Sequence, residues 1–394
     1  MVVLTETEVR SQPGLLAEAW TRPETFVLLP EKSSVSREWM DRTLGSLPEK
    51  HRRGCFALLT SGTTGQPKLV LGERDRAVAL AEELHRRQKS EGLRESVSVL
   101  PLAYSYSFVN QWLWSHVHGR RLMLTPGFGE PKSVQAALEA AREAMVCMVG
   151  VQVPLLLSQC PGRVFPGMVR VHFAGGRFPQ EKLEDLARMF PQAKIFNNYG
   201  CAEAMPRLTV REAVEATEGA NVGKPLRGIE LATTEESAIV FRSPYGAIGV
   251  VEDHVFRPIE PEEWIPSGDL GQIEPDGALR LIGRNSEVFK RHGEKVSLAT
   301  LASTVAAVWH GQLAFYREQD AAGEEGCVLA LTPNADLETI RPVLMELRRR
   351  HPRAHWPLRI ETLEVLPMLP NGKPDLRQIA ASTEKKEIWK QHIK

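Results

Sequence analysis

The residues best suited to chemistry lie in one short stretch, Thr60–Lys68, which reads TSGTTGQPK. Its hydroxyls and glycines can present O–H and backbone N–H donors to an anion, and its lysine adds a positive charge. Such groups bind phosphate. The stretch lacks the GxxxxGK[ST] spacing of a Walker loop, so any phosphate would be held in a different way. A Ser/Thr-rich hairpin turn without a ligand is the alternative.

Two strands are needed to position this stretch. Cys55–Leu59 is an apolar run typical of a buried strand, and Lys68–Leu71 is expected to pair with it across the glycine-rich loop. Up to about Phe196, apolar runs alternate with segments of helical periodicity, which predicts a doubly wound α/β layer. The further strands expected there are Val97–Leu100, Leu122–Leu124, Met145–Val149, Val169–Phe173 and Lys194–Phe196, with helices at Ser133–Arg142 and Gln180–Met189.

After Asn221 the pattern changes to short β-like pieces separated by Pro and Gly. Strands are expected at Ala238–Phe241 and Gly249–His254, and a hairpin is expected around the turn Glu274–Gly277. From about Arg284 a small α+β region is predicted, with helices at Thr300–Val308 and Leu337–Arg350 and strands near Leu313–Phe315, Val328–Leu331 and Arg359–Leu363. The polar tail Ser382–Lys394 is expected to fray.

The composition excludes several classes of function. The 394 residues include 49 Lys and Arg and 49 Asp and Glu, so the formal net charge is zero, which argues against coating of nucleic acid or of an anionic membrane. No apolar run is long enough to cross a bilayer, and the N-terminus lacks a secretory signal pattern. The five cysteines show neither zinc nor disulfide spacing. We therefore predict a cytoplasmic protein that binds neither nucleic acid nor membrane.

The stretch Thr60–Lys68 closely resembles the phosphate loop of the adenylate-forming superfamily, which includes acyl- and aryl-CoA synthetases, peptide-synthetase adenylation domains and luciferases. Further motifs of that superfamily follow in the same order. Asn198–Glu203 resembles YGxTE, Asn221–Pro225 resembles VGKP, Ser267–Asp269 resembles (T/S)GD, Gly283–Gly293 resembles GRxxxxxKxxG, and Pro370–Asp375 resembles PxGKxD. The ordered series extends over residues 55–380, which makes a chance match negligible.

This resemblance implies an α/β fold with two domains. A large AMP-binding domain with doubly wound sheets and a β-rich subdomain would occupy residues 1–284, and a small mobile α+β lid would occupy residues 287–394, with a hinge near 285–286. Ser286 stands where relatives usually carry Asp or Lys. Relatives also have a longer segment before the phosphate loop. Either Met1–Arg53 or a partner subunit is expected to cover the missing layer, or it remains uncovered.

The resemblance implies which residues bind ATP and Mg²⁺. The β- and γ-phosphates would lie in the loop formed by Thr60, Ser61, Gly62, Thr63, Thr64, Gly65 and Lys68. Glu203 would hold Mg²⁺, which takes hard oxygen ligands and bridges phosphates. Ala202 stands where the family usually has Thr, so we expect slower adenylation through the loss of one hydroxyl near the α-phosphate.

The adenosine would lie between other motifs. Tyr199, within Asn198–Gly200, would stack on adenine, and Gly175 and Gly176 would border the opposite face. Asp269 would accept hydrogen bonds from the ribose hydroxyls. Arg284 would lie beside the ribose and phosphate, and Lys290 belongs to the same motif as Arg284.

Lys373 is the residue implied for the attack step. It would contact the substrate carboxylate and the α-phosphate together, while pyrophosphate leaves. No general base is needed, because a carboxylate is already ionised near pH 7. The acyl-AMP would then react with a thiol after the small domain rotates, and Arg291–Gly293 would replace Lys373 near the thiol channel.

The acyl pocket is expected around Leu100–Phe108, which resembles the family's PLFHxxG-like element with Tyr104 at its His position. Tyr104, Tyr106 and Phe108, together with Gly175, are the candidate lining residues. The alternative is that these aromatic residues are ordinary core. No Asp stands nearby to hold an ammonium group, which disfavours an amino acid. An aryl acid is favoured, followed by a short acyl acid.

Together these residues predict an ATP-dependent acid–thiol ligase that uses CoA or the phosphopantetheine thiol of an acyl carrier protein as acceptor. The alternative is a transfer-only or non-catalytic paralogue that acts as a partner subunit. The basic run Arg348–Arg353 could contact CoA or a carrier protein, although a solvated helix end is the commoner meaning of such a run. His116 and His118 are interpreted as structural rather than as metal ligands.

Overall fold

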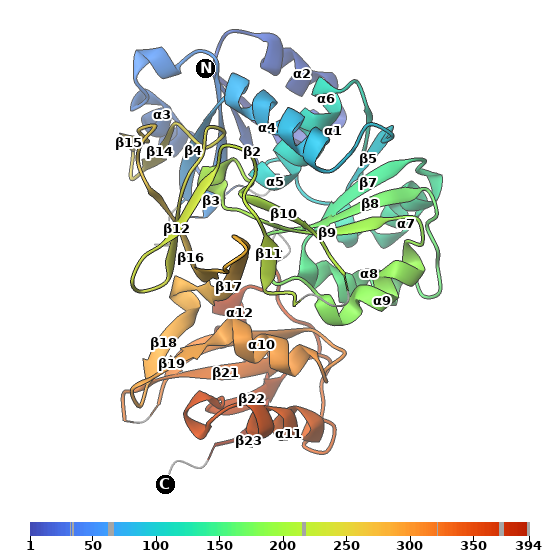
Figure 1. Ribbon diagram of the computed structural model, residues 1–394, viewed down its shortest axis with the longest axis vertical. Helices are drawn as coiled ribbons and strands as arrows, with labels where there is room; N and C mark the ends of the chain where they lie inside the picture. The colour runs from blue at the N-terminus through green and yellow to red at the C-terminus, as the bar shows by residue number, and fades with distance from the viewer. Residues whose placement is uncertain are drawn as a thin grey trace.

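The computed structural model describes residues 1–31, 33, 35–61, 67–214, 218–320, 322–369 and 374–391. Figure 1 shows a large upper part built from the N-terminal and central sequence and a smaller lower part built from the C-terminal sequence. Among the residues described, no helix combines the length and the apolar character needed to cross a membrane. The mixed α/β architecture agrees with the fold class predicted from the sequence.

The first sheet carries the phosphate loop and has the strand order β1-β2-β3-β4-β14-β15. Strands β3 (Cys55–Ser61) and β4 (Pro67–Glu73) pair antiparallel with Thr60 opposite Lys68, which confirms the predicted hairpin. Strands β1 (Val2–Thr5) and β2 (Phe26–Leu29) extend this sheet in parallel from the other side of β3. The residues before the loop thus add two strands to the sheet that carries it.

A strand is found within the expected segment Gly249–His254, for which the sequence predicted no partner. Strand β14 (Gly249–Glu252) pairs with β4 of the first sheet and with β15 (Val255–Pro258). Its valines, Val250 and Val251, are buried in this sheet opposite Val70 and Leu69. A pairing between segments so distant in the sequence leaves no local signal.

The second sheet is the predicted doubly wound layer, with strand order β10-β9-β8-β7-β5-β6. All neighbouring pairs are parallel except the pair of β9 with β10. The strands are β5 (Glu95–Ser98), β6 (Arg121–Leu124), β7 (Ala144–Met148), β8 (Met168–Phe173), β9 (Lys194–Tyr199) and β10 (Thr209–Glu212). The helices near it are α4 (Arg74–Arg87), α7 (Pro131–Ala140), α8 (Val153–Gln159) and α9 (Leu183–Met189).

The third sheet is antiparallel, with order β11-β17-β16-β13-β12, and confirms the predicted hairpin of β16 (Ile265–Ile273) and β17 (Leu279–Arg284). The remaining strands are β11 (Asn221–Gly223), β12 (Glu230–Thr233) and β13 (Ala238–Arg242). Because β16 and β17 face each other with Asp269 opposite Arg284, this sheet brings two predicted site residues together.

The C-terminal segment has its own sheets and its own core. A short hairpin joins β18 (Val288–Arg291) and β19 (Glu294–Ser297), and the main sheet has the order β20-β21-β22-β23. The elements are β20 (Leu313–Gln319), β21 (Glu325–Leu331), β22 (Arg359–Thr362), β23 (Lys386–Lys390), α10 (Leu298–Ala306), α11 (Arg341–Arg350) and α12 (Leu376–Ala381). Its apolar cluster contains only residues from Phe289 onward, which supports the proposed boundary near 285–286.

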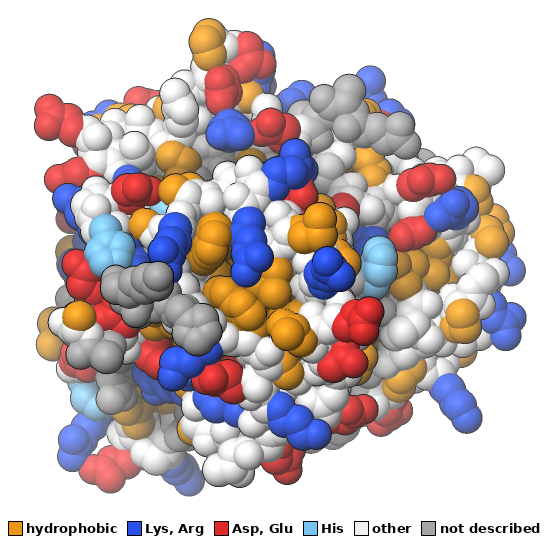
Figure 2. Space-filling view, turned by 90° about the horizontal axis from the view of Figure 1, so that it is seen from below, with side chains coloured by type: hydrophobic (Ala, Val, Ile, Leu, Met, Phe, Trp, Pro, Cys, Tyr) orange, Lys and Arg blue, Asp and Glu red, His pale blue; other side chains and the backbone are white. Residues whose placement is uncertain are grey.

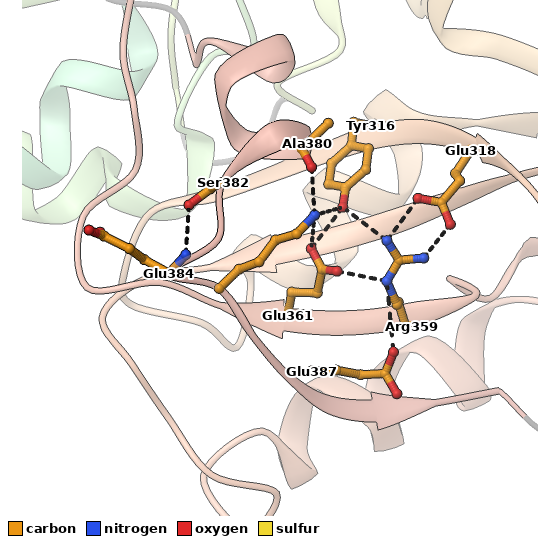
Figure 3. A network of polar contacts seen from close by, with 9 residues as sticks. Tyr316, Glu318, Arg359, Glu361, Ala380, Ser382, Glu384 and Glu387 are labelled. Carbon is orange, nitrogen blue, oxygen red and sulfur yellow. Dashed lines mark hydrogen bonds and ion pairs between the residues drawn. The ribbon is translucent and has the colours of Figure 1, made fainter.

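The C-terminal tail does not fray as expected. Strand β23 pairs antiparallel with β22, so residues 386–390 are part of the sheet. Figure 3 shows the polar network beside this pair, in which Arg359 hydrogen-bonds to Glu318 and to Glu361 Oε1 at 2.7 Å. Lys385, just before β23, contacts Glu361 Oε2 at 3.3 Å. The charge of Lys385, in this polar tail, is therefore paired with a buried carboxylate.

Replacing Arg359 with Met is expected to destabilise the C-terminal part. The carboxylate of Glu361 is only 4% exposed, and it would lose one charged partner. Breaking a buried ion pair typically costs about 3–5 kcal/mol, and we expect about 2–3 kcal/mol here because Lys385 and Tyr316 still contact Glu361. Urea denaturation would measure the loss. Arg188→Met, at an exposed ion pair, is the control and should leave the stability unchanged.

Candidate active site

The side chains of Lys68 and Glu203 meet where the phosphate loop was predicted. Lys68 Nζ lies 2.5 Å from Glu203 Oε1, and both side chains are largely buried. Opposite Lys68 on β3, the hydroxyl of Thr60 is buried and has no hydrogen-bond partner among the described residues. A lysine, a carboxylate and an unpaired hydroxyl therefore gather at one place, although Glu203 is 135 residues from Lys68 in the sequence.

A tight backbone turn holds Glu203. The residues Ala202–Ala204 form one 3-10 turn, and Met205 follows with a left-handed φ of 53°. The chain then folds back so closely that a Cβ on Gly200 would lie 1.8 Å from the carbonyl oxygen of Pro206. The carbonyl of Glu203 accepts a hydrogen bond from the amide of Ala247 at 2.8 Å. Gly200 is thus required by backbone packing, whatever it does for a ligand.

Tyr199, Asp269 and Arg284 form a second cluster. The hydroxyl of Tyr199, at the end of β9, donates to Asp269 Oδ2 at 2.9 Å, and Arg284 Nε lies 3.2 Å from Asp269 Oδ1. Burial, and then the charge of Asp269, raises the pKa of Tyr199 well above its usual value. Tyr199 therefore remains protonated, and its hydroxyl orients the Asp269 carboxylate. Sequence analysis predicted the three residues as a nucleotide site but not these mutual contacts.

The glycine pair and Asn198 lie at the ends of neighbouring strands. Gly175 follows β8 with φ +78°, a conformation that favours glycine, and a Cβ on Gly176 would meet no atom of the described residues within 4 Å. The amide of Asn198 donates to the carbonyl of Phe173 at 3.1 Å and so ties β9 to β8. The segment 175–176 and Tyr199 thus come from adjacent parallel strands, as their predicted place on either side of one ligand requires.

Comparison with known proteins identifies the family. The profile of a family described as AMP-binding enzyme matches residues 6–257. This chain belongs to that family. It is 26% identical to a D-alanine–D-alanyl carrier protein ligase of Staphylococcus haemolyticus over 82% of this chain and 70% of the relative. It is 24% identical to pseudomonine synthase PmsE of Pseudomonas entomophila over 95% of this chain and 65% of that protein.

Solved structures share the fold. The O-succinylbenzoate coenzyme A synthetase MenE of Bacillus subtilis, solved in complex with AMP, superposes with a TM-score of 0.71 at 18% identity, and the match covers 98% of this chain and 84% of that one. The sequence-based assignment to the AMP-binding family and its fold is thereby confirmed.

Several predicted site residues are not in either cluster or cannot be placed. Gly62, Thr63, Thr64, Gly65 and Lys373 lie outside the described residues, as does the side chain of Ser61. Lys290 is exposed on β18, in the C-terminal part. Arg291 is 3% exposed and pairs with Asp320 at 3.3 Å, so it is held inside the C-terminal part as the structure stands. The roles of these residues in this member of the AMP-binding family stay predictions.

The three aromatic residues predicted for the acyl pocket are in different environments. Phe108 is fully buried, and its ring centroid lies 4.9 Å from that of Phe56 and 5.0 Å from that of Trp112. The core alternative therefore describes Phe108. Tyr104 is partly buried, whereas Tyr106 lies under the guanidinium of Arg207, 5.3 Å from the ring centroid. Tyr106 therefore adjoins a charged group.

Two alanine variants would separate these environments. Phe108→Ala is expected to cost about 3–5 kcal/mol of unfolding free energy, because it removes a ring from the aromatic cluster. Tyr106→Ala should instead redistribute preference among acid substrates. Urea denaturation and pyrophosphate release over a panel of acids would measure the two effects. A uniform loss of activity over all acids, together with lower stability, in Tyr106→Ala would assign Tyr106 to the core as well.

Two further predictions concern the surface. The basic run begins in the last turn of α11, where Arg349 and Arg350 both contact Glu346 and Arg348 lies over Trp356, so the helix-end interpretation fits its contacts. Figure 2, seen from the C-terminal end, shows Lys and Arg side chains spread among hydrophobic and acidic ones.

In the described part of the chain no group of three potential ligands could hold a metal, and His118 stacks on His85 with ring centroids 4.0 Å apart.

Proposed function

We propose that this member of the AMP-binding family is an ATP-dependent acid–thiol ligase. It would join a carboxylic acid to AMP and transfer the acyl group to the thiol of CoA or of an acyl carrier protein. The observation that carries the proposal is that the short segment 199–203 contributes a residue to each of the two clusters. Its Glu203 pairs with Lys68 at the end of the phosphate loop, and its Tyr199 hydrogen-bonds to Asp269. A phosphate site and a ribose site linked in this way suit one nucleotide.

The residues suit ATP. Lys68 would neutralise the leaving pyrophosphate, and the Thr60 hydroxyl, which has no protein partner among the described residues, is free to donate to a phosphate oxygen. Asp269, already oriented by Tyr199 and Arg284, would accept hydrogen bonds from the ribose. Adenylation needs two anions to approach each other, so cations at the site are the main requirement.

The residues also fit Mg²⁺. The described residues offer the Glu203 carboxylate and no cluster of three protein ligands, which matches an ion that keeps several waters and binds mainly to substrate phosphates. When bound, Mg²⁺ would supply neutralisation of phosphate charge. Glu203 would then leave its ion pair with Lys68 and bind the metal instead.

The rival is a paralogue that does not adenylate. Ala202 prompts it, because a hydroxyl is missing beside Glu203. The retained charges of Lys68, Glu203, Asp269 and Arg284 favour catalysis.

The test is pyrophosphate release over a panel of aryl and short acyl acids, with Mg²⁺ and ATP, with and without CoA. Acid-dependent release is the expected result, and thioester formation with CoA would identify the acceptor. No release with any acid, while supplied acyl-AMP is still converted to thioester, would establish the transfer-only alternative. If the acceptor is a carrier protein, we expect pyrophosphate release without CoA and no thioester when CoA is added.

A further inference from the structure

Arg207 is a buried cation without an acidic partner. Its side chain belongs to a residue that is 1% exposed, and Nη2 donates to Asn110 Oδ1 at 2.6 Å. Nη1 is also buried and meets no hydrogen-bond acceptor among the described residues. No carboxylate of the described residues forms an ion pair with it. By contrast, Arg291 is similarly buried and pairs with Asp320 at 3.3 Å.

Such a cation is costly. A charge removed from water is normally paired, because the neutral amide of one asparagine does not replace the lost hydration. Burial accordingly lowers the pKa of Arg207 below its usual value. An anion placed next to Nη1 would relieve this cost, and arginine is suited to bind a carboxylate through two parallel hydrogen bonds.

The side chains around Arg207 are polar but uncharged. The guanidinium lies over the ring of Tyr106, and Cys147 and His172 are neighbours on β7 and β8. Burial raises the pKa of Cys147 to about 12 and lowers the pKa of His172 far below its usual value, so both are neutral. Both ring nitrogens of His172 lack hydrogen-bond partners within the described part of the chain. The cluster offers donors and a positive charge, and no negative charge.

The cluster adjoins the candidate active site. Arg207 is four residues beyond Glu203, just after the turn Ala202–Ala204, and a Cβ on Gly200 would lie 2.9 Å from the Cα of Arg207. His172 is three residues before Gly175 on β8. The same two segments that place Glu203, Tyr199 and Gly175 thus place Arg207 and His172 on the buried side. An acid whose first carboxylate reacts at the nucleotide would extend its other end toward this interior.

We propose that Arg207 binds a second carboxylate at the far end of the substrate, and that the acid activated by this protein is a dicarboxylic acid. The inference rests on the proposed function and names its substrate class. It also strengthens the case against an amino acid, because a buried guanidinium repels an ammonium group. Tyr106, Asn110 and His172 would be uncharged neighbours of the second carboxylate.

The test compares acids that differ only in the far carboxylate: butanoate with succinate, pentanoate with glutarate, and benzoate with terephthalate. Pyrophosphate release by the unmodified protein should favour the dicarboxylic member of at least one pair by tenfold or more. Arg207→Met should reduce this preference at least tenfold, and Arg207→Lys should retain part of it. Arg211→Met, at a half-buried arginine further along the same segment, is the matched control and should leave the preference unchanged.

Three results would overturn the inference. One is a preference of the unmodified protein for the monocarboxylic acid in every pair. Another is an equal loss on both members of a pair in a folded Arg207→Met variant, which would make Arg207 structural. If Arg207→Met does not fold, the inference is still tested by the Arg207→Lys variant and by the preference of the unmodified protein between the two acids of each pair. If neither the monocarboxylic nor the dicarboxylic acids cause any release of pyrophosphate, the proposed function is contradicted, and this inference with it.

Discussion

Replacing Lys373 with Ala is expected to stop adenylation and to spare the thiol step. We propose from its motif that Lys373 contacts the substrate carboxylate and the α-phosphate together, and its loss would then leave two anions facing each other. Loss of one electrostatic contact of this kind typically costs about 2.7–4 kcal/mol, or 10²–10³-fold in rate. In the proposed two-conformation mechanism, the thiol step begins from a finished acyl-AMP, after the small domain has turned and carried Lys373 away.

Two assays on one protein would check this. Pyrophosphate release measures the first step, and conversion of synthetic acyl-AMP to thioester measures the second. Lys386→Ala, on exposed β23, is the control and should change neither. Equal collapse of both steps in a folded Lys373→Ala variant would contradict the two-conformation mechanism. Full adenylation by the variant would remove Lys373 from the catalytic assignment.

The elements that the sequence predicted well are those with a local signal. The β3–β4 hairpin and the β16–β17 hairpin each have two apolar runs joined by a turn, and both were found. The partner of β14 was not predicted and β23 was missed, because their partners are far away in the sequence. The polar tail was expected to fray, whereas β23 pairs with β22 and Lys385, just before β23, contacts the buried carboxylate of Glu361.

The site residues also divide into those with a local sequence signal and those that depend on distant contacts. Motif spacing singled out Lys68 and Glu203 separately, but nothing in the sequence shows that they pair, because this depends on the packing of the first sheet against the turn after β9. Arg207 was missed altogether. A lone arginine in an apolar stretch, Met205-Pro206-Arg207-Leu208, is the signal that could have found it, since an arginine there must be buried. Phe108 was over-interpreted, because aromatic type alone does not distinguish a pocket from a core.

The pair of Lys68 and Glu203 gives the second large expected effect. If the residues serve ATP and Mg²⁺, Glu203→Gln and Lys68→Met should each lower adenylation by more than tenfold, or about 1.4 kcal/mol. The Glu203→Gln loss should shrink as Mg²⁺ is raised, while the Lys68→Met loss should not. Each single variant also leaves a largely buried partner unpaired, which we expect to cost about 1–3 kcal/mol of stability.

The double variant distinguishes catalysis from structure. Removing both charges leaves no unpaired ion, so the double variant should regain most of the stability lost in the single variants. Its activity should not recover, because neither the metal ligand nor the phosphate cation is present. Lys194→Met with Glu212→Gln, at an exposed pair with a 3.1 Å contact, is the control and should change little in either measurement. Recovery of activity along with stability would mean that the ion pair only holds the turn after β9 against β4, and Glu203 would lose its assignment as a metal ligand.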